Sequence, residues 1–284
     1  MSLPNQLTIF PSPPVEVRDD IACFHPGSAG KDYPERDFEL LRSIEDGHFW
    51  FESRNLVLEH LVRKFLLGDG SAKTFLEIGC GTGFVLRMLA KMENLRVAGA
   101  EIHLTGARLA AGRVEGAAEV VQLDALRMTF ETAFDAVGVF DVIEHLDEDV
   151  EVLRRIGDAL KPGGFCFVSV PQHARLWSPQ DDMAGHKRRY SRKMLLQRLK
   201  EADLETVYIT SFCFAVMPLF IVSRLRKQRL SRAEAEEHLM SEVTLSPRIN
   251  RMLKAMLQID LMCIRSGLSL PWGGSLVAVA RRPR

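Results

Sequence analysis

The stretch TFLEIGCGTGF, residues 74–84, decides the fold. Its opening residues, TFLEI, are β-favouring or apolar around a single acid, which predicts a strand, and an apolar run follows the last glycine. Between them stand Gly79, Gly81 and Gly83. A glycine-rich turn between a strand and a helix lets the backbone approach a ligand closely and points the helix N-terminus at that ligand. The stretch therefore predicts a strand–turn–helix unit with a ligand at its glycines.

Strand-like and helix-like runs alternate on both sides of this stretch. We expect strands at residues 73–79, 96–101, 119–123, 134–140, 164–170, 205–211 and 275–281. We expect helices at residues 55–67, 83–92, 104–113, 147–160, 191–202 and 246–266. Such an alternation indicates βαβ units, in which helices cover both faces of a parallel sheet, and so an α/β fold.

Composition excludes several classes of protein. The 284 residues are 46% hydrophobic, and 37 Lys and Arg balance 37 Asp and Glu, so no global field would attract nucleic acid. The cysteines never form a CxxC pair, which argues against a disulfide framework or a zinc ribbon: Cys23, Cys80, Cys166, Cys213 and Cys263. The start, MSLPNQLTIFPSPPVEVRDD, lacks the features of a signal peptide. We therefore expect a cytoplasmic protein without a nucleic-acid partner.

Charged residues near the glycines narrow the choice of ligand. A dinucleotide fingerprint would need a further glycine at position 84, where Phe84 stands, so a pyrophosphate is disfavoured. Glu77 precedes the glycines and suits a positively charged ligand without phosphate, such as S-adenosylmethionine. Glu101 ends the second strand, where a carboxylate can bind a ribose diol, although it could instead cap the next helix. Asp124 could bind the adenine amino group, or serve only as a turn residue.

Several motifs together resemble the class I S-adenosylmethionine-dependent methyltransferases. The resemblance covers about residues 73–171 and rests on the E-x-G-x-G-x-G of the first strand, the acid ending the second, the LDA after the third, FDAVGVFDVIEHLDED and LKPGGFCFVSVP. DVIEHL with LKPGG is most similar to the small-molecule branch, which includes quinone and sugar methyltransferases. HFWFESRN and GHKRRYSRKML resemble flanking elements of bacterial methyltransferases of cell-surface glycan or lipid pathways.

The resemblance implies a Rossmann-like methyltransferase fold. Its seven-stranded, mostly parallel sheet would have the order 3-2-1-4-5-7-6, with the last strand antiparallel. The chain would then divide into an irregular N-terminal arm (1–35), helices covering the site (36–72), the cofactor-binding core (73–211), a helical cap insertion (212–272) and the final strand (273–284).

The expected cofactor is S-adenosylmethionine. Motif positions and strand ends assign it these residues: Glu77, Gly79, Cys80, Gly81, Gly83, Glu101, Ile102, Asp124, Ala125 and Asp141. Trp50 and Phe51 either close over the cofactor or acceptor, or anchor the start of a helix.

The acceptor side is expected between the fifth strand and the helix at 191. A hydroxyl acceptor would need a base, for which His145, His186 and Tyr190 are candidates, whereas a carboxylate or thiolate would need none. His145 could equally cap the helix that follows it. We expect the acceptor to contact Trp177, His186, Arg189 and Tyr190. Asp141, Glu144 and His145 could ligate a divalent cation, but no further ligand stands at a suitable spacing, so no metal site is predicted.

Residues 212–222, FCFAVMPLFIV, are too few to span a bilayer, and the basic cluster RLRKQRLSR follows at 224–232. Residues 212–232 could lie on an anionic membrane surface, or form a helix packed over the site or against a second copy. The protein is then a monomer or a homodimer, and its cytoplasmic location could be peripheral to the membrane.

The sequence thus predicts a methyltransferase that acts on a small or lipid-linked acceptor, at an oxygen. Two alternatives stay open: a nicotinamide-dependent oxidoreductase, which Phe84 disfavours, and a scaffold that binds S-adenosylmethionine without catalysis.

Overall fold

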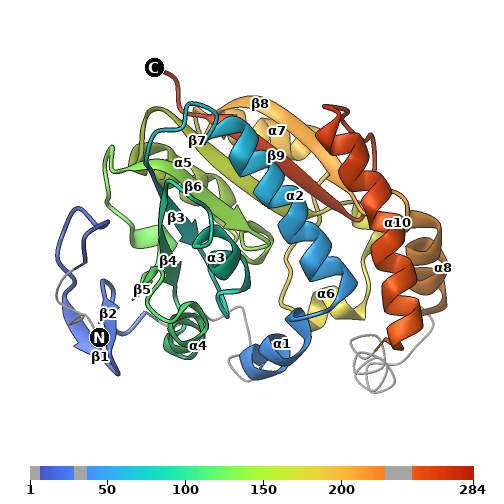
Figure 1. Ribbon diagram of the computed structural model, residues 1–284, viewed down its shortest axis with the longest axis horizontal. Helices are drawn as coiled ribbons and strands as arrows, with labels where there is room; N and C mark the ends of the chain where they lie inside the picture. The colour runs from blue at the N-terminus through green and yellow to red at the C-terminus, as the bar shows by residue number, and fades with distance from the viewer. Residues whose placement is uncertain (1–6, 29–36, 228–244) are drawn as a thin grey trace.

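A mixed β-sheet forms the centre of the protein. The computed structural model describes residues 7–28, 37–227 and 245–284, and within these residues the sheet has nine strands (Figure 1). In spatial order they are β1 (Glu16–Arg18), β2 (Ile21–Cys23), β5 (Glu119–Gln122), β4 (Leu95–Glu101), β3 (Lys73–Ile78), β6 (Phe134–Phe140), β7 (Leu160–Pro171), β9 (Ser275–Arg281) and β8 (Glu205–Phe212).

The predicted strand order is confirmed. The run β5-β4-β3-β6-β7-β9-β8 is the expected 3-2-1-4-5-7-6, and β9 pairs antiparallel with both β7 and β8. The strands from β5 to β7 are parallel, so their carboxyl ends meet at one edge of the sheet, the edge at which ligands bind in open α/β folds.

The sheet has two more strands than predicted, because part of the N-terminal arm is regular. β1 and β2 form a hairpin, and β2 extends the sheet by pairing parallel to β5, with Ala22 opposite Val121. Asp19 and Asp20 make the turn with φ of 50° and 63°, a left-handed conformation that Asp tolerates better than most residues. β2 is fully buried and covers what would otherwise be an open edge of the sheet. The arm was therefore wrongly expected to be irregular at this point.

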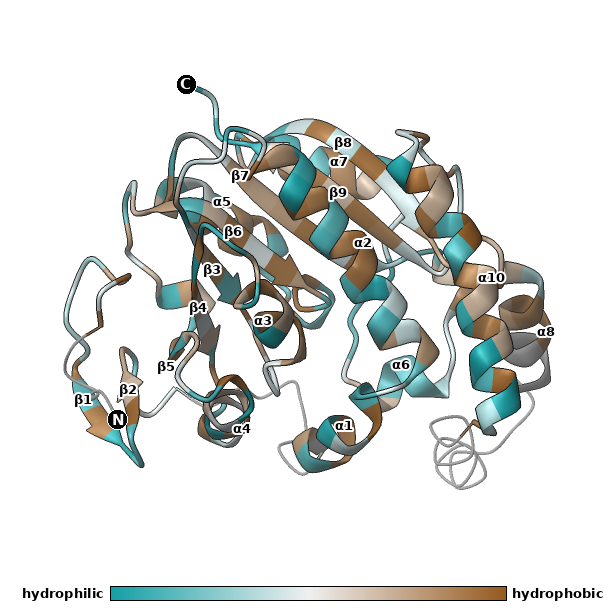
Figure 2. Cartoon of the chain, in the orientation of Figure 1, coloured by the Kyte–Doolittle hydropathy of each residue, from teal (hydrophilic) through white to brown (hydrophobic). Residues whose placement is uncertain are grey.

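Alternating side chains of each central strand bury into two separate cores. Leu76 of β3 belongs to a core with α5 (Asp149–Ala159) and α7 (Arg192–Glu201). The next residue towards the N-terminus, Phe75, belongs to the core on the other face, with α2 (Phe49–Phe65) and α3 (Phe84–Leu89). In Figure 2 the strands β7 and β9 are accordingly mostly hydrophobic, as expected for strands covered on both faces.

Further helices flank these layers. α10 (Pro247–Arg265) lies beside α2 and contributes to the same core, and α4 (Leu104–Val114) follows β4 (Figure 1). The remaining helices are α1 (Asp37–Glu45), α6 (Pro179–Met183) and α8 (Met217–Lys227). None of the helices in the described parts of the chain is long and apolar enough to cross a bilayer.

A buried carboxylate anchors the chain between β8 and β9. Asp260 of α10 is fully buried and accepts hydrogen bonds from the backbone N–H groups of Phe214, at 2.6 Å, and Ala215, at 3.0 Å. Burial raises the pKa of Asp260, and the two N–H donors oppose this shift. The contact fixes the start of the insertion against α10, on the side of the sheet where α2 lies.

Candidate active site

A cavity of about 570 Å³ opens at the carboxyl ends of the central strands. Its wall is built by the β3–α3 turn, the ends of β4 and β6, the segment after β5, α1 and the start of α2. Most residues predicted to hold the cofactor line it: Glu77, Gly79, Cys80, Gly81, Glu101, Ile102, Asp124, Ala125 and Asp141. Gly83 does not line it, and neither do the described residues of 212–272, so the described part of the predicted cap insertion does not contribute to the cavity wall.

Gly81 and Gly83 are required for different reasons. A Cβ on Gly83 would lie 2.8 Å from the Ala110 Cα, so this glycine lets α3 approach α4. A Cβ on Gly81 would meet no atom within 4 Å, although its φ of 55° is one that side chains rarely adopt. Gly81 therefore leaves open space in the cavity wall for a ligand, whereas Gly83 has a packing role.

Glu101 connects the end of β4 to the glycine turn. Its Oε2 accepts the Gly81 N–H at 2.9 Å, and its Oε1 accepts the His103 N–H at 3.0 Å. The N-cap position of α4 is occupied by His103, so Glu101 is not the N-cap residue. Since each carboxylate oxygen has a second lone pair, both can still accept a bond from a ligand hydroxyl in the cavity.

Glu77 is a buried carboxyl with an unsatisfied oxygen. The residue is 2% exposed, and its Oε2 has no hydrogen-bond partner among the described residues. Burial raises its pKa well above the usual value, and the Arg54 guanidinium opposes this shift. A buried polar atom without a partner is costly, so this position favours a ligand that carries positive charge or a hydrogen-bond donor.

An ion pair joins α2 to the end of β6. Arg54 Nη1 lies 2.5 Å from Asp141 Oδ2, which also accepts the Ser169 hydroxyl at 3.0 Å. The guanidinium stacks 4.6 Å from the centre of the Trp50 ring. Trp50, Phe51 and Arg54 all line the cavity. The aromatic residues at the start of α2 therefore face the site, and Arg54 holds them there, a role that the sequence did not indicate.

A second buried network holds α1 over the cavity. Glu45 of α1 pairs with Arg113 of α4 and accepts the Thr82 hydroxyl, and Arg113 also donates to Thr82 at 2.8 Å. The side chains of Glu45 and Arg113 are at most 5% exposed. Phe38, Leu41 and Glu45 of α1 line the cavity as a result. No spacing pattern in the sequence predicted these contacts, because the paired residues lie far apart in the chain.

Asp124 follows β5 in a tight turn. Its carboxylate accepts the Leu126 N–H at 3.0 Å, and its own N–H donates to His25 Nδ1 at 3.2 Å. Asp124 is therefore a turn residue that also lines the cavity. His25 follows β2, so the N-terminal hairpin positions this part of the wall.

His145 and His186 are the predicted acceptor-side residues that line the cavity. His145 ends the 3-10 helix η2 (Ile143–His145), which follows β6, and His186 lies in the loop after α6. Their ring centres are 4.8 Å apart. The segment after β6 and the loop after α6 thus place the two imidazoles side by side.

The other predicted acceptor residues support the loop and do not line the cavity. Tyr190 is fully buried, and its hydroxyl donates to Asp149 at 2.8 Å. Burial and Asp149 raise its pKa, so it stays protonated and is unsuited to act as a base. Arg189 pairs with Asp181 at 2.7 Å, and Trp177 Nε1 donates to Asp182 at 3.0 Å. The expectation that these three side chains contact the acceptor is therefore not met in this structure.

Sequence comparison identifies the family. Residues 50–209, more than half of the 284-residue chain, match the family described as Methyltransferase domain. The chain belongs to this family. The expected methyltransferase is confirmed, and the nicotinamide-dependent oxidoreductase and the non-catalytic scaffold are not supported.

Individual relatives are distant. An Idiomarina loihiensis ubiquinone biosynthesis O-methyltransferase is 25% identical over 53% of this chain and 69% of its own length. A cypemycin N-terminal methyltransferase from a Streptomyces species is 26% identical over 60% of this chain and 71% of its own. For the O-methyltransferases of Hydrogenovibrio crunogenus and Marinobacter nauticus, the match spans less than half of their length, 42% and 44%.

Solved structures agree on the fold. A Haloferax volcanii methyltransferase, in complex with the Trm112 methyltransferase activator, has a TM-score of 0.59 at 16% identity, over 88% of this chain and 97% of its own. Haemonchus contortus phosphoethanolamine N-methyltransferase 2, in complex with S-adenosyl-L-methionine, has a TM-score of 0.56 at 18% identity, over 89% of this chain and 58% of its own. S-adenosylmethionine is the cofactor of this methyltransferase, and the open space at Gly81 and the unsatisfied Glu77 oxygen fit it.

Gly81→Val should weaken S-adenosylmethionine binding at least tenfold relative to Gly81→Ala. Both variants must adopt a left-handed backbone, which is more strained for β-branched valine than for alanine, and only valine extends branches into the open space. Isothermal titration of both folded variants measures the difference. Equal affinities would show that the cofactor does not approach the backbone at Gly81.

Glu77→Gln should stabilise the ligand-free protein while weakening S-adenosylmethionine binding at least tenfold. Because the folded pKa of Glu77 is raised above the ordinary 4.5, its ionisation opposes folding. The gain in melting temperature should therefore be absent below about pH 4.5 and grow as the pH rises towards the raised pKa. Melting curves across this range, with titration of the cofactor at pH 8, give both readouts. Unchanged cofactor affinity would separate Glu77 from the binding site.

Proposed function

We propose that the protein transfers a methyl group from S-adenosylmethionine to an oxygen of a small or lipid-linked acceptor. The observation that carries this proposal is the pair of imidazoles, His145 and His186, in the wall of the cofactor cavity. An acceptor hydroxyl must lose a proton on methylation, and histidine is the side chain best suited to receive one near neutral pH.

Residues at the strand ends would hold the cofactor. When bound, S-adenosylmethionine supplies an electrophilic methyl group, so the protein has mainly to position the acceptor and exclude water. Glu77 would face the positive charge of the cofactor, and Glu101 would accept bonds from its ribose. Asp124 would accept a bond from the adenine amino group. α1 and the aromatic start of α2 would cover the site, held by the Glu45–Arg113 and Arg54–Asp141 pairs.

A carboxylate orients one of the two imidazoles. His186 Nδ1 lies 2.9 Å from Asp181 Oδ1, and Asp181 is 1% exposed. A carboxylate that accepts a hydrogen bond from the Nδ1–H group leaves Nε2 as the lone-pair nitrogen. His186 would therefore present an acceptor nitrogen, and His145 lies against it.

Distant relatives support oxygen as the methylated atom. Several of them are ubiquinone biosynthesis O-methyltransferases, 25% to 32% identical to this chain over the matched residues. The cypemycin relative acts on an N-terminus by name, which makes nitrogen the alternative outcome of the test.

The function should be visible as transfer of labelled methyl groups to a phenol, with catechol as the first probe. His145→Ala and His186→Ala should each lower turnover at least tenfold, about 1.4 kcal/mol, and leave cofactor affinity within twofold. His60→Ala, a histidine of α2 outside the cavity, is the matched control. Transfer to a peptide amine and not to phenols, or full activity of both variants, would contradict the proposal.

A lipid-linked acceptor would be reached from a membrane surface. On α8 and α10, large apolar side chains are 45% to 62% exposed: Leu219, Val222, Ile249, Met252, Ile259 and Met262. The single acid of α10, Asp260, is buried, while Arg248, Arg251 and Arg265 add positive charge to the helix. An apolar surface with adjoining positive charge suits an anionic bilayer. We propose that this surface extends the predicted contact of residues 212–232, of which 228–232 lie outside the described residues.

Ile259→Asp should lower binding to phosphatidylglycerol vesicles at least tenfold, because it places a negative charge in the exposed apolar face. Leu196→Asp, at an exposed leucine of α7, should leave binding unchanged. Co-sedimentation with anionic and neutral vesicles measures both. Absence of vesicle binding by the native chain would contradict a membrane contact, and a dimer that Ile259→Asp dissociates would assign the surface to a second copy.

A further inference from the structure

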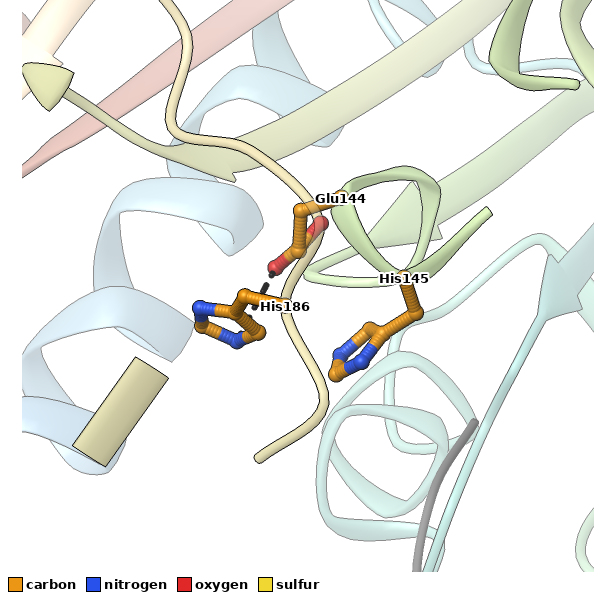
Figure 3. A group of neighbouring side chains, drawn as sticks. All are labelled: Glu144, His145 and His186. Atoms are coloured by element: carbon orange, nitrogen blue, oxygen red, sulfur yellow. Dashed lines mark ion pairs between the residues drawn. The ribbon is translucent and has the colours of Figure 1, made fainter. Parts of the chain in front are cut away.

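Three metal-ligating side chains converge at the acceptor wall of the cavity. Glu144 and His145 come from η2 and His186 from the facing loop, and one potential ligand atom of each lies within 4.8 Å of the others (Figure 3). We propose that Glu144, His145 and His186 bind a divalent transition-metal ion. Sequence spacing could not predict this site, because its third ligand lies 41 positions after His145 and is brought close only by the fold.

The buried carboxylate of Glu144 favours a bound cation. Glu144 is fully buried, and neither of its oxygens has a hydrogen-bond partner among the described residues. The guanidinium groups of Arg54 and Arg189 already pair with Asp141 and Asp181. A buried carboxylate without hydrogen bonds is strongly destabilising, and coordination of a cation would satisfy both its charge and its lone pairs.

His186 has the support typical of a metal ligand. Its Nδ1 contacts Asp181 Oδ1 at 2.9 Å, which leaves Nε2 directed towards Glu144, 4.0 Å from Oε1. Asp181 is fixed in turn by Arg189 and by the Ser178 N–H at 2.9 Å. Metal-bound histidines usually donate their other ring N–H to such a carboxylate, which sets the tautomer and the ring orientation.

The backbone holds the two halves of the site together. The Lys187 N–H donates to the Glu144 carbonyl at 2.8 Å, so the loop that carries His186 is bonded directly to η2. Small movements of the three side chains would bring their donor atoms to the roughly 2.0–2.2 Å from an ion that zinc requires. The site is thus built from main chain and supporting carboxylate, and not only from exposed side chains.

The donor set selects the kind of ion. Two imidazoles and one carboxylate suit Zn²⁺, Mn²⁺, Fe²⁺ or Co²⁺, whereas Mg²⁺ prefers oxygen ligands in an octahedron. Three protein ligands leave coordination positions open, and His145 and His186 face the cavity. An acceptor hydroxyl that binds there would become more acidic and release its proton to solvent. With an ion present, the imidazoles act as ligands and not as bases; this role, unlike the binding itself, rests on the proposed function.

Direct titration tests the metal site without relying on activity. Chelator-treated full-length protein, made without a polyhistidine tag, is titrated with Zn²⁺ and separately with Mg²⁺. We expect one Zn²⁺ per chain and at least a hundredfold weaker binding of Mg²⁺. With Co²⁺ as the probe, visible absorption bands should report nitrogen and oxygen coordination.

Variants assign the ligands. Glu144→Gln and His186→Ala should each weaken Zn²⁺ binding at least tenfold, whereas His60→Ala should not. Glu144→Gln removes a buried charge, so it is expected to fold, and melting curves check this. Failure of the native protein to bind Zn²⁺, or unchanged binding in both variants, would overturn the proposal.

Titration of S-adenosylmethionine, together with methylation assays with and without metal, separates this inference from the proposed function. Both variants should keep cofactor affinity within twofold. Metal binding without phenol methylation would contradict only the acceptor proposal, and metal-free methylation at full rate would contradict the metal role.

Discussion

Three buried glutamate side chains organise this active site. Glu77, Glu101 and Glu144 are each at most 5% exposed. Glu77 and Glu101 line the cavity at the ends of β3 and β4, and Glu144 lies in η2, just after β6. Burial raises the pKa of each of them. Backbone N–H groups satisfy Glu101, but Glu77 and Glu144 keep oxygens without hydrogen bonds. The ligand-free protein therefore carries an electrostatic cost that positively charged ligands would offset, so stability and binding are coupled at these residues.

α1 and the start of α2, which line the cavity, are held in place by buried charges that are paired with one another. Arg54 with Asp141 fixes the aromatic start of α2, and Arg113 with Glu45 fixes α1. Breaking a buried pair leaves an uncompensated charge, which costs about 3–5 kcal/mol, so these pairs specify where the cover sits. Paired charges thus hold α1 and the start of α2 at the cavity, and the unpaired carboxyl oxygen of Glu77 in its wall favours a positively charged ligand.

Much of this organisation could be predicted from sequence, because it depends on local patterns. The strand order was implied by the family resemblance that short sequence motifs carry. The cavity-lining residues at the strand ends, such as Glu77 and Gly81, stand at motif positions separated by only a few residues of one turn. The hairpin of β1 and β2 was missed because a proline-rich context concealed the Asp19-Asp20 turn. The Glu45–Arg113 pair could not be found at all, since nothing local marks two charges 68 positions apart as partners.

The loop 173–190 shows why polar density is a poor guide to a substrate site. From sequence, its aromatic and charged residues look like one binding wall. In the structure most of them bond to other protein side chains: Arg189 pairs with Asp181, Trp177 bonds to Asp182, and Tyr190 bonds to Asp149 of α5. Of the predicted acceptor contacts only His186 reaches the cavity, and it does so because Asp181 and Arg189 support it from behind. A side chain that must hold a fixed orientation at a reacting centre needs such partners, so a single functional histidine can account for several polar residues around it.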